Sequence, residues 1–281
     1  MAMDVIGVTG ASGQLGGRIA ARLAGRGQPL RLVVRDPARA PSLPGAGVAV
    51  ASYQDPAALR QALDGVGTLL LVSATEAADR REQHAIAVDA AVAAGVARIV
   101  YTSFTGAAPD AAFTFARDHW YTEQHIRETG IGFTFLRDNL YMDLMPSLAD
   151  DEGVIRGPAG DGRAGVVARD DIADAATAVL LDHAHDGATY DLTGPQALTM
   201  TEVAEEITRV TGREVVYQAE TVEEAYASRA RYGAPDWEVE GWVTSYTAIA
   251  EGELDLVTDA VATLAGHPPI SFADHLAAGK G

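Results

Sequence analysis

The sequence predicts a doubly wound α/β protein with a smaller, mostly helical C-terminal lobe. Up to Leu136, short β-branched runs alternate with alanine-rich helical stretches, which is typical of repeated βαβ units around a parallel sheet. Continuous apolar runs such as Leu69-Leu70-Leu71-Val72 fit strands that are covered on both faces. From Gly194 onward the pattern becomes mostly helical, which indicates a second lobe.

The expected elements follow one another in this alternating order. Strands are predicted at Asp4–Thr9, Leu30–Val34, Val48–Ala51, Thr68–Ser73, Arg98–Ser103, Gly132–Leu136 and Thr189–Leu192. Helices are predicted at Gly13–Arg26, Pro56–Leu63, Asp79–Ala94, Ala111–Thr129 and Asp170–Leu181. Later signals are a turn-rich crossing at Gly153–Gly162, a helix start at Thr199 or Thr201 with Glu202, and a strand at Glu214–Gln218.

Composition excludes several classes of protein. The formal net charge of −18 argues against direct binding of nucleic acid or of anionic membrane surfaces, which require a basic face. The sequence has no cysteine, so disulfides, thiolate nucleophiles and cysteine-bound metals are excluded, and no other group of side chains has metal-ligand spacing. The only lysine is Lys280, so the body of the protein offers none for a Schiff base or a Walker loop. With no signal-peptide pattern or membrane-length apolar run, we expect a cytoplasmic protein.

A glycine-rich loop follows the first predicted strand and opens the first predicted helix. The loop reads Thr9-Gly10-Ala11-Ser12-Gly13-Gln14-Leu15-Gly16. Three glycines at this spacing permit a tight turn, close approach of a diphosphate to the backbone, and close packing of helix on strand. The helix N-terminus then offers N–H groups and a positive dipole end to the phosphates. The loop therefore predicts a Rossmann-type dinucleotide-binding domain, with a flexible turn as the alternative.

The end of the second predicted strand indicates which dinucleotide binds. A carboxylate there grips the ribose 2′-hydroxyl of NAD, whereas an arginine accommodates the 2′-phosphate of NADP. The segment Val33-Val34-Arg35-Asp36-Pro37 favours NADP(H), with Arg35 on the phosphate and Asp36 as a cap of the turn before Pro37. The alternative is that Arg35 is a solvated surface residue and Asp36 contacts the ribose.

The domain bounds follow from these signals. We expect the NADP-binding domain to comprise residues 1–139 and 166–193, and the substrate lobe to comprise residues 140–165 and 194–281. A small substrate would sit in a cleft between two such lobes. The sequence leaves a homodimer open.

Several segments of the sequence resemble those of the NmrA-like atypical short-chain dehydrogenases, and among these the NAD(P)H:quinone oxidoreductase type 2 branch. They are the glycine loop, Val-Val-Arg-Asp-Pro, Val100-Tyr101-Thr102-Ser103, Ala94-Gly95-Val96, Thr134–Tyr141, Tyr190–Gly194 and Gly266-His267-Pro268. The resemblance covers essentially the whole chain. It implies that Gly10, Ala11, Ser12, Gly13, Gln14 and Leu15 wrap the pyrophosphate and that Arg35 binds the 2′-phosphate. It also implies that Tyr53, Ser73, Ala74 and Thr75 line the adenosine side, with Thr102 and Ser103 nearer the nicotinamide.

The helix predicted at Ala111–Thr129 departs from the short-chain dehydrogenase pattern. Ordinary members carry Tyr-x-x-x-Lys there, and this sequence places His119 and Glu123 in the tyrosine and lysine positions. The two residues are four apart, so they share a helix face and could hydrogen-bond. A histidine beside a carboxylate can donate a proton near neutral pH, so His119 and Glu123 are candidate catalytic residues. Ser103, which the resemblance places near the nicotinamide, is the third. The alternative is a structural pair that holds the preceding loop.

Candidate substrate residues lie after the strand at Gly132–Leu136 and in the second lobe. Asn139 and Tyr141 could hydrogen-bond a carbonyl at a strand end, where sheet folds place ligands. Trp237 and Trp242 could offer flat walls to an aromatic ring, or could simply pack the lobe.

Three functions are compatible with these residues. The first is an NADPH-dependent reductase of a quinone, a related conjugated carbonyl or another aromatic small molecule. The second is an NADP(H)-sensing regulatory binding protein without turnover, which the missing tyrosine and lysine favour. The third is a tailoring reductase of an aromatic or imine secondary metabolite, in keeping with an arginine- and alanine-rich bacterial composition.

Overall fold

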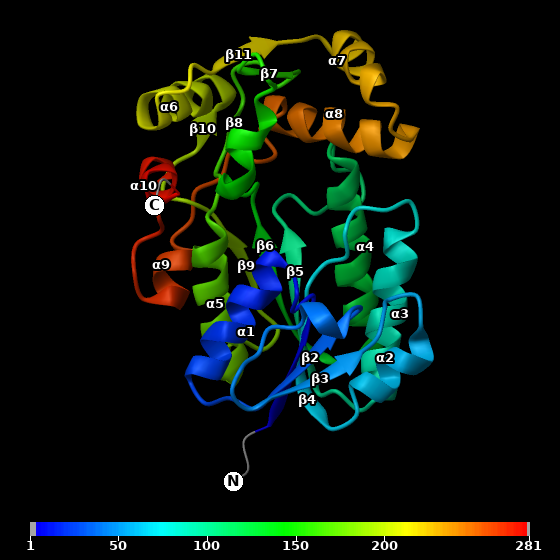
Figure 1. Ribbon diagram of the computed structural model, residues 1–281. Helices are drawn as coiled ribbons and strands as arrows, with labels where there is room; N and C mark the ends of the chain where they lie inside the picture. Colours follow the sequence, from blue (N-terminus) through cyan, green and yellow to red (C-terminus); the bar gives the residue numbers. More distant parts are fainter. Residues whose placement is uncertain (1–3, 280–281) are drawn as a thin grey trace. The chain divides into compact units, whose positions relative to one another are not determined.

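The computed structural model describes residues 4–279, and its central feature is a seven-stranded sheet in the order β3-β2-β1-β4-β5-β6-β9 (Figure 1). The pairings of β2 with β3, β1 with β2, β1 with β4, and β4 with β5 are all parallel. The strands are β1 Val5–Thr9, β2 Leu30–Val34, β3 Ala46–Val50, β4 Val66–Leu71, β5 Arg98–Phe104, β6 Gly132–Asp138 and β9 Thr189–Leu192. The order reverses direction at β1 and β4, so the predicted doubly wound α/β fold is confirmed.

Five helices connect these strands, each close to its predicted bounds. They are α1 Gln14–Gly25, α2 Pro56–Ala62, α3 Arg80–Ala93, α4 Thr114–Thr129 and α5 Arg169–Leu181, and the 3₁₀ helices η1 Pro37–Arg39, η2 Met142–Leu148 and η3 His183–His185 lie in loops. Helix α1 buries Leu15, Ile19 and Leu23, which recur every four residues and form its apolar face. Helix α2 begins where the Asp55 side chain accepts a hydrogen bond from the Ala58 amide at 2.9 Å.

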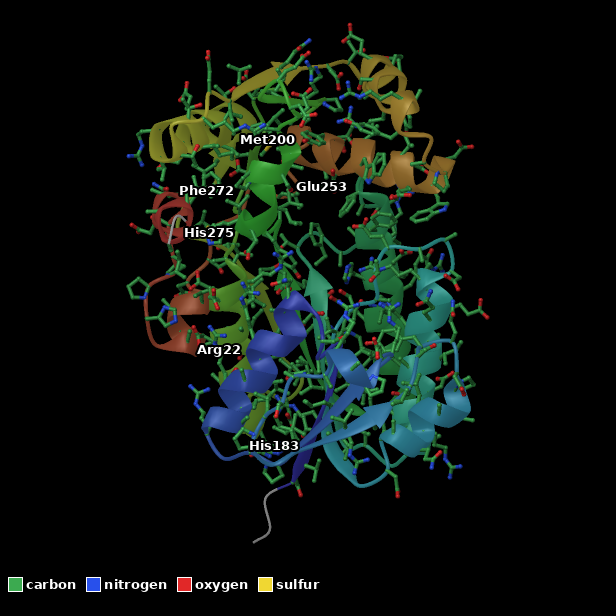
Figure 2. All side chains as sticks on the ribbon, in the orientation of Figure 1. Arg22, His183, Met200, Glu253, Phe272 and His275 are labelled. Carbon is green, nitrogen blue, oxygen red and sulfur yellow. The ribbon has the colours of Figure 1, made fainter. Side chains whose placement is uncertain are left out.

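The chain divides into two compact units. Unit 1 comprises Met1–Ser103, Asp118–Arg137 and Ile172–Tyr190, and unit 2 comprises Phe104–Arg117, Asp138–Asp171 and Asp191–Gly281. Four stretches predicted to belong to the first domain group with unit 2, namely residues 104–117, 138–139, 166–171 and 191–193. In unit 1, Arg22 of α1, which Figure 2 labels, forms an ion pair with Asp174 of α5 at 2.7 Å, and α2 packs on α3.

Unit 2 is mostly helical around two small sheets. Its remaining strands are β7 Val154–Gly157, β8 Arg163–Ala164, β10 Leu198–Thr199 and β11 Val216–Ala219; its helices are α6 Met200–Thr211, α7 Val222–Arg229, η4 Ala230–Tyr232, α8 Asp236–Ala250, α9 Ala260–Ala265 and α10 Phe272–Ala278. Strand β7 pairs in parallel with β11, and β8 pairs antiparallel with β10. Helix α6 begins with a capping box of Thr199 and Glu202, as predicted.

The core of unit 2 brings together distant parts of the chain. Met200 of α6 and Phe272 of α10 are both buried in it (Figure 2). The Glu253 carboxylate accepts the backbone N–H of Ala112 at 2.9 Å, which fixes the segment before α4. No helix within residues 4–279 is long and apolar enough to cross a membrane.

Candidate nucleotide-binding and catalytic site

A glycine cradle connects β1 to α1. Gly10 has a φ of +61°, in the left-handed region that favours glycine. A Cβ atom on Gly16 would lie only 2.4 Å from the carbonyl oxygen of Gly10, so no larger residue fits there without moving the loop. These two glycines hold the start of α1 tightly against the end of β1, and they leave the N-terminus of the helix open.

The N-terminus of α1 is suited to bind an anion. In the described part of the chain no side chain caps it at Gly13, and its first turn contains no acidic residue. It opens on a cavity of about 600 Å³ that Arg35 and Arg39 also line. Unused N–H donors, a positive dipole end and two guanidinium groups together fit a dinucleotide with an additional phosphate on its adenosine ribose. NADP(H) is therefore a cofactor that these residues could hold.

The residues expected around the nucleotide lie in two layers. Those that line the cavity are Gly10, Ser12, Gly13, Gln14, Leu15, Arg35, Tyr53, Ser73, Ala74 and Thr75. Ala11 and Thr102 are buried behind this surface, and the Thr102 hydroxyl accepts the Ser73 amide at 2.9 Å. Thr102 thus supports a lining residue. Asp36 caps the turn of η1 by accepting the Ala38 amide at 2.9 Å, as predicted.

Sequence reasoning missed Arg39. It lies four residues after Arg35, at the end of the short helical turn that Asp36 caps. The available signal was an aspartate followed by proline, because this pattern starts a short turn whose last residue comes back toward the strand end.

Tyr53 forms part of the cavity wall through its hydroxyl group. That oxygen lies 2.6 Å from Thr9 Oγ1 and 2.7 Å from the Val72 carbonyl oxygen, so it joins the ends of β1 and β4. Burial raises the pKa of the Tyr53 hydroxyl above its ordinary value, and the phenol remains neutral. The residue before it is Ser52, which also lines the cavity.

Two side chains of α3 hold the peptide groups of Ala74 in the cavity wall. The Ala74 N–H donates to Nε2 of His84 at 2.8 Å, and Nε of Arg80 donates to the Ala74 carbonyl at 3.0 Å. Arg80 and His84 are four residues apart on one buried face of the helix. Sequence reasoning assigned neither residue a role, because a charged residue at a helix start is usually exposed to solvent.

The same two side chains reach α4 and include His119. Arg80 contacts His119 Nε2 at 3.0 Å, and the Tyr101 hydroxyl lies 2.9 Å from His119 Nδ1. A guanidinium group can only donate, so Nε2 accepts and the single imidazole proton sits on Nδ1, where it points to Tyr101. Burial, followed by the charge of Arg80, holds the pKa of His119 well below its ordinary value. His119 is therefore a neutral imidazole, rather than the protonated acid that the sequence suggested.

The single imidazole proton of His84 also lies on Nδ1, as in His119. Its Nε2 accepts from Ala74, so Nδ1 carries the proton and donates to Thr122 Oγ1 at 2.8 Å. The Thr122 hydroxyl in turn donates to the Asp118 carbonyl at 2.8 Å. Burial and the Arg80 charge lower the pKa of His84 to about 3. The whole network therefore requires both imidazoles to be neutral.

Glu123 has partners other than the expected His119. Among the described residues, its carboxylate accepts the Ser103 hydroxyl at 2.6 Å and two hydrogen bonds from Arg137, at 2.8 and 2.7 Å. Both Glu123 and Ser103 are buried. A bidentate arginine fixes the carboxylate at the position that a lysine occupies in ordinary short-chain dehydrogenases. The sequence pattern did not predict this role of Arg137.

The candidate substrate residues near the end of β6 differ in exposure. Asn139 is buried, and its side chain bonds with the Leu140 amide at 2.7 Å and the Leu254 carbonyl at 3.1 Å. Tyr141 is partly exposed, and its hydroxyl lies 2.9 Å from Oδ2 of Asp138. Burial raises the pKa of the Asp138 carboxyl to about 8. Asn139 thus shapes the loop, whereas Tyr141 presents a polar group.

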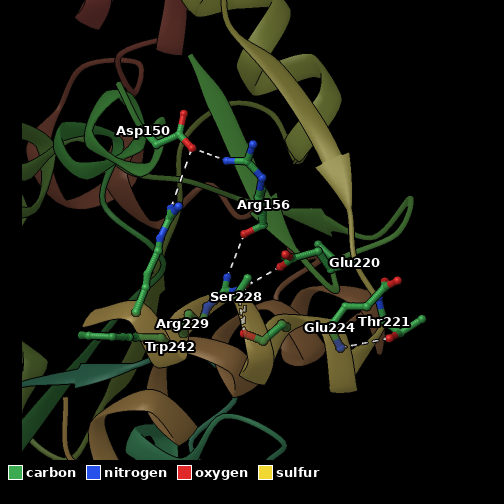
Figure 3. A network of polar contacts seen from close by, with 12 residues as sticks. Asp150, Arg156, Glu220, Thr221, Glu224, Ser228, Arg229 and Trp242 are labelled. Carbon is green, nitrogen blue, oxygen red and sulfur yellow. Dashed lines mark hydrogen bonds and ion pairs between the residues drawn. The ribbon is translucent and has the colours of Figure 1, made fainter. Parts of the chain in front are cut away.

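The two tryptophans lie in different surroundings within unit 2. Trp237 packs edge-on against Phe115, with ring centroids 6.2 Å apart, beside the core. Trp242 lines a separate cavity of about 420 Å³ together with Tyr232. An ion-pair network borders this cavity, in which Asp150 contacts Arg156 and Arg229 contacts Glu220 (Figure 3).

The sheet, the glycine cradle and the arginine pair define a dinucleotide-binding α/β protein. The sequence profile of the NmrA-like family matches residues 2–237, and the chain belongs to this family. It is 35% identical over 277 residues to quinone oxidoreductase 2 of Escherichia coli, with 96% of each chain covered.

Solved structures show the same relationship. The E. coli NADPH-dependent quinone oxidoreductase complexed with NADPH superposes with a TM-score of 0.89 at 34% identity, covering 98% of this chain and 100% of that one. The triphenylmethane reductase of Citrobacter sp. complexed with NADP(H) has a TM-score of 0.86 at 33% identity, covering 98% and 99%. These similarities extend over both units of the chain.

Proposed function

We propose that this protein is an NADPH-dependent reductase that delivers hydride to a quinone or a related electron-poor conjugated acceptor. The observation that carries the proposal is 35% identity to a quinone oxidoreductase over nearly the whole chain. A cavity lined by the glycine loop, Arg35 and Arg39, which suits a dinucleotide with an additional 2′-phosphate, supports it. When bound, the reduced nicotinamide supplies two electrons and a hydrogen nucleus as hydride. The substrate is a small molecule.

The residues of the chain divide the work of binding. The open N-terminus of α1 receives the diphosphate, and Arg35 with Arg39 receives the 2′-phosphate. Ser73, Ala74 and Thr75 face the nucleotide, and Arg80 and His84 hold this segment in place from behind. Preorganised groups of this kind bind without rearrangement, which favours both affinity and orientation.

His119, Glu123 and Ser103 form a fixed, buried support in this proposal. His119 donates to Tyr101 and accepts from Arg80, and Glu123 is held by Ser103 and Arg137. Protonation of His119 would place a second positive charge against Arg80, which the buried surroundings oppose. These residues join β5 to the middle of α4.

Turnover with purified protein tests the proposal. NADPH is mixed with a panel of benzo- and naphthoquinones, and loss of the reduced nicotinamide absorbance is followed. We expect quinone-dependent oxidation of NADPH in preference to NADH, because of Arg35 and Arg39. Tight NADP(H) binding with no oxidation across the panel would instead support a sensing role.

We further propose that the protein works in the bacterial cytoplasm. The use of a reduced dinucleotide in the proposed reaction supports this placement. Fractionation of a cell that expresses the native gene, followed by immunodetection, tests it.

A further inference from the structure

Two glutamine side chains in the wall of the nucleotide cavity are joined by one carboxylate. Gln54 follows β3, Gln83 lies in α3, and both line the cavity. Asp79, the residue before α3, accepts a hydrogen bond from Nε2 of Gln83 at 2.7 Å and another from Nε2 of Gln54 at 3.3 Å. Each carboxamide therefore bonds with one oxygen of the same carboxylate.

The carboxylate determines which way both amides face. The hydrogen bonds from Gln83 and from Gln54 lower the pKa of Asp79, so the group is ionised at neutral pH and can only accept. An amide turned by half a rotation would place its oxygen against this negative charge. Nε2 of each glutamine is thus occupied by Asp79, and Oε1 is left as a hydrogen-bond acceptor in a residue of the cavity wall.

Both glutamines belong to backbone that is held in place. The Ser52 hydroxyl accepts the Gln54 amide at 3.1 Å. Helix α3 is attached to the cavity wall through Arg80 and His84, which bond with the peptide groups of Ala74. The two amide oxygens are therefore preorganised, so a ligand that bonds with them needs no rearrangement of the chain.

The pair lies on the adenosine side of the cavity. Strand β3 pairs with β2 up to Val50 and Val34, so the segment after β3 lies beside the one that carries Arg35. Arg35 and Arg39 suit a 2′-phosphate, which NADP carries on its adenosine ribose. The base on that ribose is the part of the nucleotide that Gln54 and its neighbours can contact.

Adenine offers the groups that two oxygen acceptors require. Its 6-amino group is a donor, whereas guanine carries an acceptor oxygen at the same place, and so does hypoxanthine. A base oxygen that faces two fixed amide oxygens, with a carboxylate behind them, makes no hydrogen bond and loses those it had with water.

We propose that Gln54 and Gln83 select adenine as the base of the cofactor through its 6-amino group, and that Asp79 is the positioning residue that fixes both amides. This inference rests on the proposed function, because it requires NADP(H) in the cavity. It concerns the identity of the base and is separate from recognition of the 2′-phosphate by Arg35 and Arg39.

An analogue that is changed at one position of the base isolates this contact. Nicotinamide hypoxanthine dinucleotide phosphate carries an oxygen in place of the 6-amino group and keeps the 2′-phosphate. The Kd values of its reduced form and of NADPH are measured by fluorescence titration with the wild type, Gln54→Leu, Gln83→Leu and Asp79→Asn. Gln61→Leu is the matched control, because Gln61 is an exposed glutamine of α2 that does not line the cavity.

We expect the wild type and Gln61→Leu to bind NADPH about 10-fold more tightly than the hypoxanthine analogue. Each glutamine variant should lose part of this preference through weaker binding of NADPH. Asp79→Asn should lose it in another way, through tighter binding of the analogue. An asparagine amide can donate to Oε1, so a glutamine can turn its Nε2 toward the oxygen of the base.

Equal affinity of the wild type for the two nucleotides would overturn the inference. A preference of wild-type size in Asp79→Asn or in both glutamine variants would overturn it as well. If the wild type binds neither nucleotide, the proposed function itself fails. If it binds NADPH and reduces no quinone, only the proposed turnover fails, because the ratio of the two Kd values tests selection of the base without any reaction.

Discussion

Arg35 and Arg39 lie beside the end of β2, and their side chains determine the electrostatics of one end of the nucleotide cavity. A 2′-phosphate offers oxygens for charge-assisted hydrogen bonds with both guanidinium groups, whereas a 2′-hydroxyl offers no charge. Asp36 is occupied with the turn of η1 through its bond to Ala38, which leaves the arginines to set the preference.

Arg35→Ala is expected to raise the Kd for NADPH by about 10- to 100-fold, because the lost contacts are charge-assisted. The Kd for NADH should change little. Arg31→Ala is the control, since Arg31 lies in β2, four residues before Arg35, and bonds with the Ala62 carbonyl outside the cavity. Fluorescence titration with both nucleotides measures the effect, and equal losses of affinity for NADPH and NADH would contradict the role of Arg35.

Gly16→Ala is expected to destabilise the protein and weaken nucleotide binding, because the new Cβ would lie 2.4 Å from the Gly10 carbonyl oxygen. Gly25→Ala in the same helix has nothing within 4 Å of its Cβ. That control should be neutral or stabilising by about 0.4–1 kcal/mol. Urea unfolding of the two variants tests the contrast; if both behave alike, the close approach is not what requires glycine at position 16.

At the level of elements, α3 and α4 are joined by polar groups that remain neutral. His84 must be unprotonated to accept from Ala74, and its folded-state pKa is lowered to about 3. In the unfolded chain a histidine binds a proton below about pH 6.5. Between these values the unfolded state holds more protons, so the free energy of unfolding falls as pH falls.

His84→Gln should remove this contribution, because glutamine can also accept from Ala74 but does not titrate. The slope of the unfolding free energy against pH between about pH 5 and 6.5 should become shallower by up to about 1.4 kcal/mol per pH unit. His183→Gln is the control, since His183 is exposed in a 3₁₀ helix. Parallel slopes for the wild type and His84→Gln would show that His84 is already charged in the folded protein.

In unit 2, a buried ion pair connects helix α7 to the strands beside it. Arg229 at the end of α7 contacts Glu220 at 2.8 Å and the Arg156 carbonyl at 2.8 Å (Figure 3). Both side chains of the ion pair are largely buried. Arg229→Met would leave Glu220 without its partner and should cost about 3–5 kcal/mol of unfolding free energy. Arg231→Met, at an exposed arginine nearby, should cost less than about 1 kcal/mol. Similar losses in both variants would contradict this account.

Local patterns predicted elements far better than partners. The glycine loop, the caps at Asp36 and Thr199 and the positions of the strands needed only neighbouring residues and periodicity. The spacing of His119 and Glu123 correctly placed both on one helix. It could not show that Tyr101 and Arg80 contact His119, or that Arg137 contacts Glu123. These contacts depend on the fold, which brings together residues that are distant along the chain. Burial of Asp138, which raises the pKa of its carboxyl group to about 8, cannot be read from a single sequence.

At the scale of the whole molecule, the chain combines the cofactor cradle of its family with an altered helix α4. Glu123, which Arg137 fixes by hydrogen bonds, occupies the position of the usual lysine. His119, a neutral imidazole, occupies the position of the usual tyrosine. Quinone acceptors tolerate this change because they are strongly electrophilic, so positioning supplies much of the rate advantage. An acceptor that requires a strong acid for activation, such as a simple ketone, should be reduced poorly or not at all.

The most direct test of the central claim is single-turnover reduction of a quinone by the protein loaded with its cofactor. The rate is measured with NADPH and with NADPH that is deuterated at one or the other of its two C4 positions. We predict a normal primary isotope effect with one of the two deuterated cofactors and none with the other, with deuterium retained in the oxidised cofactor only in the second case. Tight binding of both cofactors without any quinone-dependent oxidation would contradict the claim that this protein is a reductase.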